Sequence, residues 1–529
     1  MEKNAAHVTT NNLSKKWKNL PFNGFLDDDN KINEWQKYAS LILEKSTEGN
    51  VGLIADTGTG KTIMAILVSE ALNLKTLFLA PTVILANQHA DLYKKISGKG
   101  ATIITGKVKN RKWEENRLIF ATPHVFLAEK KKGLVNLTDF DLIFFDELHK
   151  ASGDYPYVQL ANDFKQAGKK IIALSASPGA NTDKVNAVKD LYGIKNWVTA
   201  EIDMPIKNFR IIRKPVNQIL KKADELLRDL AFANLNSINQ LFDFMPGKYL
   251  VDFSEENPFL SEEKIDKLEQ AVKKLLPAKI YQGYSLLARY RKISHIYKLI
   301  MTESYFSFLD YAENSLVKDK SKAAQSLVKN LKWRELYLLI KNTKDENPKI
   351  EALHELCKEM LYKGKRMLLF VNSKVTATFL CNTLNECGYQ SATLFGGKNK
   401  STRKQAEIIK AFLNRKISII IATSVIEEGL SLPEIDVVVH YSQPNTEISR
   451  LQRDGRTGRF YEGLVVFILT DIPYENNLYY ATLAKVKVMR RMFYESARQL
   501  ELKKRQEKSQ NKNGTQLSFD FDEKEDLPF

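Results

Sequence analysis

Three cysteines, Cys357, Cys381 and Cys387, are all that this 529-residue sequence contains. They are too few and too unevenly spaced to form a disulfide framework or a zinc site, so we expect reduced, mostly buried thiols. No apolar stretch approaches the roughly 20 residues that a membrane-spanning helix needs, and the N-terminal residues lack the apolar core of a signal peptide. These absences predict a cytoplasmic protein with no membrane partner.

Acidic residues are outnumbered, since 63 Asp and Glu stand against 80 Lys and Arg, a formal net charge of +17. A charge of this sign attracts polyanions, but a lysine-rich proteome with solvated surfaces gives the same balance. The hydrophobic content of 43% and the charged content of 27% are typical of a globular protein. The length predicts three or four domains.

Strand and helix patterns divide the chain into regions. Residues 1–30 are polar and predict a flexible N-terminus. From 31 to 213, β-branched or aliphatic runs alternate with helical patterns, which predicts a parallel sheet with helices on both faces. The strand candidates there are 51–54, 76–80, 102–105, 117–121, 141–145 and 171–175.

Between 214 and 346 the strand runs vanish and helical spacing dominates, which predicts an inserted all-helical domain. The alternation returns from 347 to 495, so we expect two α/β domains with a cleft between them. Residues 496–529 are rich in Lys, Gln, Asn and Glu and predict a disordered tail. The later strand candidates are 367–371, 391–395, 417–422, 436–440 and 464–469.

A glycine-containing segment, 55–62, reads Ala-Asp-Thr-Gly-Thr-Gly-Lys-Thr and lies between an apolar run and a helical pattern. Small residues let backbone N–H groups curl around an anion, and the following helix adds its positive end. The segment therefore predicts a loop that binds the phosphates of a nucleoside triphosphate such as ATP. Lys61 would reach the β- and γ-phosphates, and the Thr62 hydroxyl would bind Mg²⁺. The residues expected in the loop are Ala55, Asp56, Thr57, Gly58, Thr59, Gly60, Lys61 and Thr62.

An acidic pair, Asp146 and Glu147, follows an apolar run in the stretch Asp-Glu-Leu-His. Carboxylates at the carboxyl end of a buried strand face the edge of the sheet where ligands bind. Asp146 would hold the same Mg²⁺ as Thr62, and Glu147 would polarise the attacking water. The alternative is an acidic strand end on the surface.

An arginine-rich stretch, Gln-Arg-Asp-Gly-Arg-Thr-Gly-Arg at 452–459, lies in the second α/β region. Arg456 and Arg459 could reach a γ-phosphate that the first domain holds. Arginines placed in this way stabilise transition-state charge and are worth about 10³–10⁵ in rate. A lone basic loop of this kind would more often be a solvated surface.

In this order the motifs resemble those of superfamily 2 helicases, from Trp35 to Arg459. The finer resemblance is to the Hef/FANCM branch and its RIG-I-like and Dicer relatives, carried by 149–158, 174–179, 422–433 and a helical insert. It implies two RecA-like, parallel-sheet P-loop domains of the α/β class with an all-helical insert between them. In the family's terms, 146–149 is motif II, 175–177 motif III, 370–373 motif IV and 452–459 motif VI.

The resemblance also implies roles for residues outside the phosphate loop. Nucleotide contacts are implied for Gln36, Gly429 and Gln452. Coupling of the nucleotide to the bound strand is implied for His149, Ser175 and Ser177. Nucleic-acid contacts are implied for Pro81, Thr82, Thr122, Pro123, Asn372 and Thr423.

The chain departs from the family pattern at Leu148, where Ala or Cys is usual, at Ser431, often Asp, and at Asp454, which is Arg in many Hef relatives. It also has no Glu-Arg-Lys-x-x-x-Asp nuclease motif of the Hef type, so we expect a motor without a nuclease. In the insert, 279–298 interleaves basic residues with tyrosines, most of which we expect to pack inward.

The tail segment Gln516–Phe521 resembles a bacterial sliding-clamp-binding peptide; a tail that binds nothing is the alternative. Together the motifs predict an ATP- and Mg²⁺-dependent DNA helicase or translocase acting on duplex or branched DNA, in repair or replication-fork processing. Two alternatives stay open. One is a double-stranded-RNA-directed ATPase of the RIG-I/Dicer kind, and the other is a nucleic-acid-gated switch that does not unwind.

Overall fold

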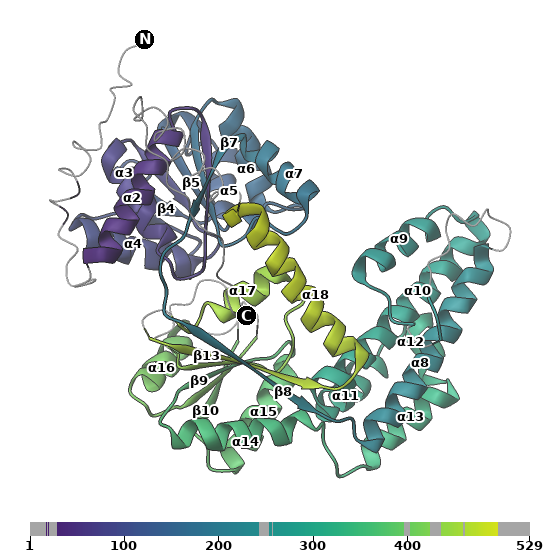
Figure 1. The fold of residues 1–529 in the computed structure, drawn as a ribbon. Helices are drawn as coiled ribbons and strands as arrows, with labels where there is room; N and C mark the ends of the chain where they lie inside the picture. The colour runs from purple at the N-terminus through teal and green to yellow at the C-terminus, as the bar shows by residue number, and fades with distance from the viewer. Residues whose placement is uncertain are drawn as a thin grey trace, which may run out of the picture.

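Two parallel β-sheets and a helical arm make up the described part of the chain (Figure 1). The computed structural model describes residues 17, 20, 29–109, 111–242, 253–255, 258–395, 402–423, 435–458 and 461–495. The arm leaves the second sheet and extends away from both sheets. The fold class expected from the sequence is confirmed.

The first sheet has seven parallel strands in the order β3-β4-β2-β5-β6-β1-β7. Helices cover both faces, because alternate residues of each buried strand point to opposite sides. In β5, for example, Phe144 packs under the helices α2, α3 and α4, whereas Phe145 packs under α5, α6 and α7. The strands are β1 (Asn50–Ala55), β2 (Thr76–Leu79), β3 (Thr102–Ile104), β4 (Leu118–Ala121), β5 (Leu142–Asp146), β6 (Lys170–Ser175) and β7 (Ile194–Ala200). The helices are α2 (Asp29–Lys45), α3 (Lys61–Leu72), α4 (Val83–Ser97), α5 (Pro123–Lys131), α6 (Pro156–Gln166) and α7 (Thr182–Tyr192).

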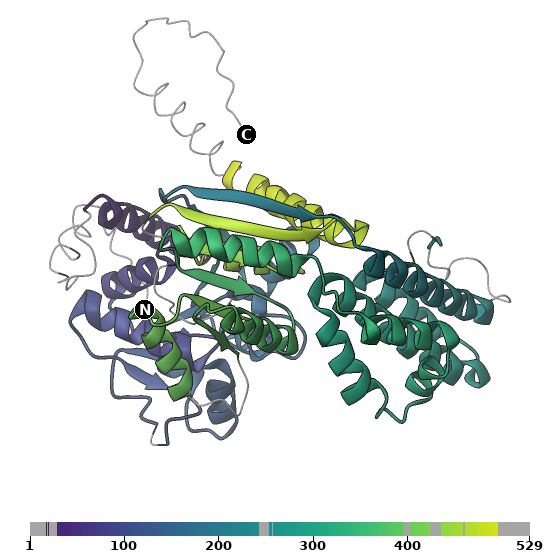
Figure 2. The ribbon, with the colours of Figure 1, turned by 90° about the horizontal axis from the view of Figure 1, so that it is seen from below.

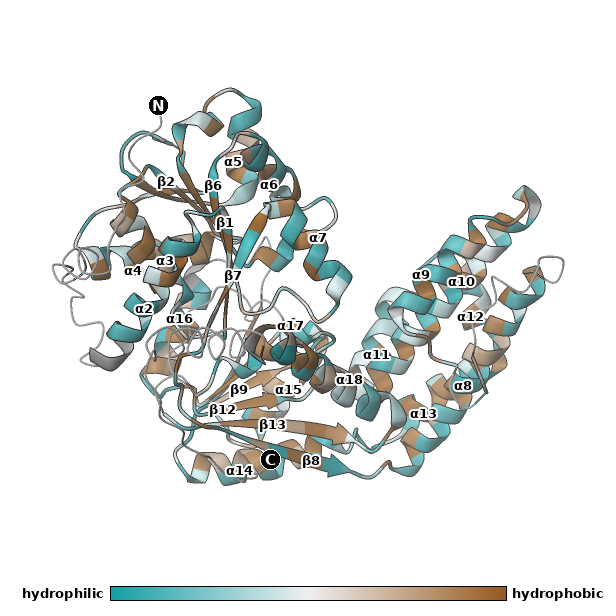
Figure 3. Cartoon of the chain, turned by 45° about the horizontal axis from the view of Figure 1, so that its top comes forward, coloured by the Kyte–Doolittle hydropathy of each residue, from teal (hydrophilic) through white to brown (hydrophobic). Residues whose placement is uncertain are grey.

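The second sheet has six strands in the order β10-β11-β9-β12-β13-β8. Figure 3 shows the strands of both sheets mostly hydrophobic, with hydrophilic residues on the outer sides of the covering helices. The strands are β8 (Lys207–Lys214), β9 (Met367–Phe370), β10 (Ser391–Leu394), β11 (Ile419–Ala422), β12 (Val437–His440) and β13 (Gly463–Thr470). The helices of this domain are α14 (Lys349–Tyr362), α15 (Lys374–Glu386), α16 (Thr402–Leu413) and α17 (Glu447–Asp454).

Strand β8 corrects the domain boundary predicted at residue 213. It precedes the insert in sequence, yet it pairs in parallel with β13 and belongs to the second sheet. As an edge strand it leaves Phe209 58% exposed and carries charged residues on both faces. Its sequence therefore lacks the buried apolar run of a central strand, and the pattern did not predict it. Strand β7 was missed as well.

The arm is built of helices with a hydrophobic core of their own. Its long axis is formed by α8 (Gln218–Asn239) and α10 (Pro277–Lys298), which pack against each other. A π-helical turn, η5 (Leu299–Glu303), continues α10 into the second domain. The remaining elements are α9 (Glu262–Val272), α11 (Tyr305–Tyr311), α12 (Lys322–Val328) and α13 (Leu331–Asn342).

The helix α18 (Pro473–Arg490) and the turn η8 (Arg491–Glu495) run from the second domain back to the first. Figure 2 shows α18 lying beside β13 and β8. At its far end Phe493 stacks edge-on against Trp197 of β7, with 5.6 Å between ring centroids. The same cluster includes Ile54, just before the phosphate loop, and Leu451 of α17. The helix thus joins both domains, a bridge that the sequence did not predict.

Among the described residues, no helix is long and apolar enough to cross a membrane.

Candidate nucleotide and nucleic-acid site

The phosphate loop lies between β1 and α3, as its sequence predicted. Gly58 and Gly60 have φ angles of 90° and 95°, a left-handed conformation that favours glycine. Lys61 opens α3, and its Nζ donates to the carbonyl oxygens of Ala55, at 2.9 Å, and Asp56, at 3.2 Å. The ammonium group is therefore held by the backbone of the loop that is expected to bind the phosphates.

Trp35 of α2 contacts the backbone of the phosphate loop. Its Nε1 donates to the carbonyl oxygen of Thr59 at 2.8 Å. A Cβ atom at Gly60 would lie 2.4 Å from the same nitrogen, so only glycine fits there. Gln36, expected to read adenine, is the next residue of α2 and is half-buried. The loop is thus fixed by a helix that precedes it in sequence.

Asp146 ends β5, and its side chain lies in a buried position at the carboxyl edge of the sheet. Its Oδ2 is 2.8 Å from Nε2 of His89 in α4, and its Oδ1 accepts from the backbone N–H of Glu147. Sequence reasoning did not single out His89, because only the fold brings α4 beside the end of β5. The histidine fixes the orientation of the carboxylate.

Glu147 adopts a left-handed backbone conformation with φ 54°. Such a conformation is uncommon outside glycine and asparagine and costs free energy that the surrounding structure must offset. It turns the chain sharply after β5, from Asp146 into the short helical turn at Leu148–Lys150. The two carboxylates therefore leave the same strand end in different directions.

His149 joins motif II to motif III. Its Nδ1 is 3.0 Å from Oγ of Ser175, and that hydroxyl in turn donates to the carbonyl oxygen of Ser177 at 2.7 Å. A hydroxyl has only one proton to donate, so His149 donates through Nδ1. Burial, more than the neighbouring Lys150, lowers the pKa of His149 to about 4. The ring is therefore neutral at pH 7.

The residues expected to contact nucleic acid all follow the carboxyl ends of strands. Thr82 is half-buried and caps α4 by accepting from the backbone N–H of Leu85. Thr122, Pro123 and Thr423 are buried. Pro81 is half-buried. The structure thus places these residues along one edge of each sheet, with Asn372 exposed and Pro81 and Thr82 half-buried.

Asn372 is engaged within the second domain. Its Oδ1 accepts from Arg453 Nη2 at 3.0 Å, and its Nδ2 donates to the carbonyl oxygen of Gln443 at 3.3 Å. Arg453 also donates to the carbonyl oxygen of Ser442 at 2.9 Å. The amide therefore holds motif VI in place, a role that the sequence did not indicate.

Motif VI meets the phosphate loop directly. Gly455 follows α17, and a Cβ atom at this position would lie 2.5 Å from Cβ of Thr57. Gln452 and Arg456 are buried beside it. The structure thus places the residue before Arg456 against the phosphate loop, and the role of Arg456 in hydrolysis stays a prediction. Gly429, Arg459 and the segment Gln516–Phe521 lie outside the described residues.

Asp454, one of the departures from the family pattern, has a buried partner. Its Oδ1 is 2.7 Å from Nε2 of His440, the last residue of β12. The His440 ring is stacked on Phe467 with 4.3 Å between centroids. This pair ties the end of α17 to the sheet, so an arginine at position 454 would need a different partner.

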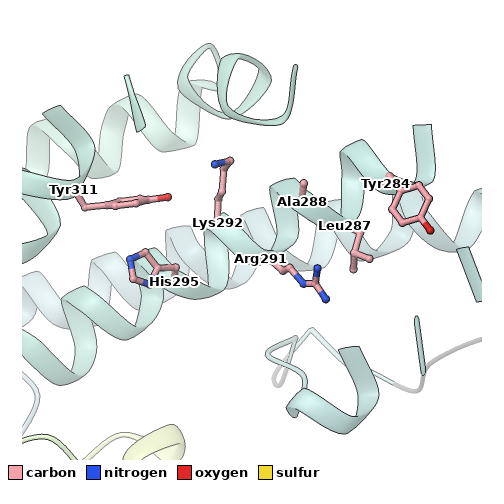
Figure 4. Close-up of a pocket in the computed structure, with 7 residues that line it drawn as sticks. All are labelled: Tyr284, Leu287, Ala288, Arg291, Lys292, His295 and Tyr311. Carbon is pink, nitrogen blue, oxygen red and sulfur yellow. The ribbon is translucent and has the colours of Figure 1, made fainter. Parts of the chain in front are cut away.

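The insert carries a groove of about 450 Å³ on α10 (Figure 4). The two basic side chains that line it form ion pairs, Arg291 with Glu269 at 2.7 Å and Lys292 with Asp319 at 2.6 Å. The expectation that tyrosines of this stretch pack inward holds for Tyr290 and Tyr297, which are buried, but not for Tyr281 and Tyr284, which are 84% and 38% exposed. The lining residues are Tyr284, Leu287, Ala288, Arg291, Lys292, His295 and Tyr311.

Fold and site together define a two-domain P-loop protein whose nucleotide loop meets an arginine motif from the other domain. Two family models match the chain, one described as "Type III restriction enzyme, res subunit" over residues 29–180 and one as "Helicase conserved C-terminal domain" over residues 348–461. The helicase domain of Hef from Pyrococcus furiosus is similar in structure, with a TM-score of 0.59 and 25% identity, covering 84% of this chain and 97% of that one.

Curated relatives extend this similarity. A putative ATP-dependent RNA helicase of Methanocaldococcus jannaschii is 27% identical, covering 87% of this chain and 61% of the relative. The ATP-dependent DNA helicase MPH1 of Pyricularia oryzae is 25% identical, with coverages of 83% and 44%. The chain therefore spans less than two thirds of these relatives' length. It belongs to the superfamily 2 DExH helicases, of the Hef/FANCM type.

Proposed function

We propose that this protein is an ATP-dependent DNA helicase or translocase that acts on duplex or branched DNA, in repair or replication-fork processing. The observation that carries the proposal is the contact between Gly455 and Thr57, which places motif VI against the phosphate loop. The names of the relatives support DNA as the substrate, since MPH1 and fml2 of Schizosaccharomyces pombe are both called DNA helicases.

The phosphate loop, motif II and motif VI divide the chemistry between them. Lys61 binds the β- and γ-phosphates, and Glu147 orients the attacking water. Arg456 and Arg459 stabilise the charge that develops when the terminal phosphate leaves. Because the arginines come from the second domain, hydrolysis requires the two domains to be closed on each other.

The donor set at the loop fits Mg²⁺. The Thr62 hydroxyl and the Asp146 carboxylate are the hard oxygen ligands that this ion prefers. The His89 contact leaves Asp146 further lone pairs for a metal, because a carboxylate accepts at about four positions. Bound Mg²⁺ would neutralise charge on the β- and γ-phosphate oxygens.

Hydrolysis is coupled to movement if both domains hold the nucleic acid. Pro81 and Thr82 of the first domain and Thr423 of the second follow strand ends on the edges that carry the nucleotide motifs. His149 and Ser175 connect motif II to motif III at 3.0 Å. Opening and closing of the cleft with each ATP would then advance the protein along the strand.

A second candidate, an RNA-directed helicase, is supported by the name of the Methanocaldococcus relative. ATP hydrolysis measured with single-stranded, duplex, forked and four-way DNA and with duplex RNA separates the two. We expect the strongest stimulation by forked or four-way DNA. Stimulation by duplex RNA alone would favour the alternative.

A strand-displacement assay on the best substrate distinguishes a helicase from a switch. We expect displacement that requires ATP hydrolysis. Stimulated hydrolysis without displacement or translocation would favour a nucleic-acid-gated switch. The clamp-binding peptide at Gln516–Phe521 stays a prediction.

A further inference from the structure

The C-terminal end of the insert's long helix, α10 with its continuation η5, is hydrogen-bonded to the second domain. The last carbonyl groups of a helix have no partner within it, yet those of the last four residues of η5, 300–303, accept hydrogen bonds from side chains of the second domain or of residues beside it. Asn347 donates to Ile300 and Met301, Thr470 to Met301, Lys349 to Thr302 and Tyr441 to Glu303. The insert is therefore fixed to the second domain at this point.

Lys349 stands at the centre of the junction and is fully buried. Its Nζ donates to the carbonyl oxygen of Thr302 at 3.1 Å and to Oε1 of Glu475 at 2.5 Å. The same nitrogen lies 4.8 Å from the centre of the Tyr441 ring. A cation at a helix C-terminus is favoured by the helix dipole. Lys349 thus joins the insert, α18 and the end of β12.

Residues 440–442 connect this junction to motif VI. His440 ends β12, Tyr441 and Ser442 follow it, and each of the three residues has a different partner. His440 binds Asp454 at 2.7 Å, and the Ser442 carbonyl accepts from Arg453 at 2.9 Å, both on α17. Between them, the Tyr441 hydroxyl donates to the carbonyl oxygen of Glu303 in the insert at 2.8 Å. Residues 440–442 therefore contact the insert through Tyr441 and motif VI through His440 and Ser442.

We propose that residues 440–442 transmit movement between the insert and motif VI, with Tyr441 as the positioning residue. The inference deepens the proposed function and rests on it. Because Tyr441 and Ser442 are adjacent and both buried, a shift of η5 that pulls on the tyrosine also moves the carbonyl group that holds Arg453. Nucleic acid that displaces the insert would in this way reposition Arg456 against the phosphate loop.

Contacts between α11 and α15 also join the insert to the second domain. Ser307 at the start of α11 binds Thr376 of α15 at 2.8 Å, and Phe306 stacks on Phe379 with 5.3 Å between centroids. Figure 1 shows α11 and α15 side by side at the base of the arm. The buried contact between Ser307 and Thr376 is therefore a second point at which the insert is fixed to the second domain.

The test compares Tyr441→Phe with Tyr290→Phe. The first variant keeps the ring over Lys349 and removes only the hydroxyl that reaches the insert. The control removes a buried hydroxyl that donates to the carbonyl oxygen of Pro258 within the insert, also at 2.8 Å. We expect Tyr441→Phe to keep the rate of ATP hydrolysis without DNA. Its rate with saturating forked DNA falls about fivefold, the size of one hydrogen bond, at an unchanged DNA concentration for half-saturation. Tyr290→Phe keeps both rates.

Equal stimulation of wild type and Tyr441→Phe would overturn the inference and leave the proposed function standing. A wild type that no nucleic acid stimulates would instead refute the proposed function. In that case amide hydrogen exchange of the peptide 290–303, measured with and without a non-hydrolysable ATP analogue, decides the inference. We expect the analogue to change exchange there in wild type and not in Tyr441→Phe. The same response in both proteins would overturn it.

Discussion

Gly455 and Thr57 are in contact across the two domains, at a distance that leaves no room for a Cβ atom on the glycine. The contact joins the residue before Arg456 to the middle of the phosphate loop. Motif VI of the second domain therefore lies against the phosphate loop of the first domain. The two motifs can lie this close only because residue 455 has no side chain.

Substituting Gly455→Ala should separate the two motifs. The added methyl group would lie 2.5 Å from Cβ of Thr57, so motif VI must move away and Arg456 with it. We expect the rate of ATP hydrolysis to fall at least tenfold, with ATP binding changed far less, since arginines of this kind act on the transition state. The combination with Thr57→Gly, which removes the opposing Cβ atom, should recover part of the rate relative to Thr57→Gly alone. No recovery would mean that the loss does not arise from this contact.

Substituting His89→Ala should weaken the binding of Mg²⁺ without abolishing it. The histidine orients Asp146 through the 2.8 Å contact, and loss of such a partner typically costs about 10–100-fold in metal affinity. We expect the Mg²⁺ concentration for half-maximal ATP hydrolysis to rise about tenfold. The exposed His124 serves as the control position, with His124→Ala expected to behave as wild type. An unchanged Mg²⁺ titration in His89→Ala would contradict the assigned role.

Lys349 and Glu475 form an ion pair with both side chains fully buried. Removing one partner leaves the other charge buried alone, which costs about 3–5 kcal/mol. We expect Lys349→Met to be destabilised by this amount in urea unfolding, with most of the loss recovered when Glu475→Leu is added. A double variant as unstable as the single one would show that the pair is not the source of the loss.

His149 predicts a dependence of stability on pH. Its pKa is about 4 in the folded protein and 6.5 as a free side chain, so between these values only the unfolded chain binds the proton. Stability is therefore lost as the pH falls from 6.5 to 4, by about 3 kcal/mol from this residue. We expect His149→Gln to lose less stability than wild type over this range in urea unfolding. The same loss in both proteins would contradict the assignment.

The nucleotide motifs were predictable because their chemistry is local. Each motif can be recognised from a few neighbouring residues: the glycines of the loop, the apolar run before Asp146 and the arginines after Gln452. The parallel sheets then bring the motifs to the edges where the strands end. The central strands were predictable for the same reason, since both faces are buried and the sequence is continuously apolar.

Other features depend on partners far away in the sequence. Nothing near His89 or His440 indicates that Asp146 and Asp454 lie beside them. Strand β8 is half exposed and reads as a charged segment. The apolar positions Val486, Met489 and Phe493 follow helical spacing, which predicts a buried face but not that it covers the first domain. The nucleic-acid contact expected of Asn372 stays a prediction, and nothing near it in the sequence indicates that its amide also holds Arg453.

The central claim is that ATP bound at the phosphate loop is hydrolysed by motifs of two domains and that nucleic acid drives the cycle. The most direct test is the rate of ATP hydrolysis by wild type and Lys61→Ala, with and without forked DNA, beside their affinities for that DNA. Lys189→Ala, at an exposed position, is the control. We predict that DNA stimulates wild type and the control. Lys61→Ala should bind the fork with similar affinity and hydrolyse no ATP. Equal hydrolysis in wild type and Lys61→Ala, or a wild-type rate that no DNA or RNA changes, would contradict the account.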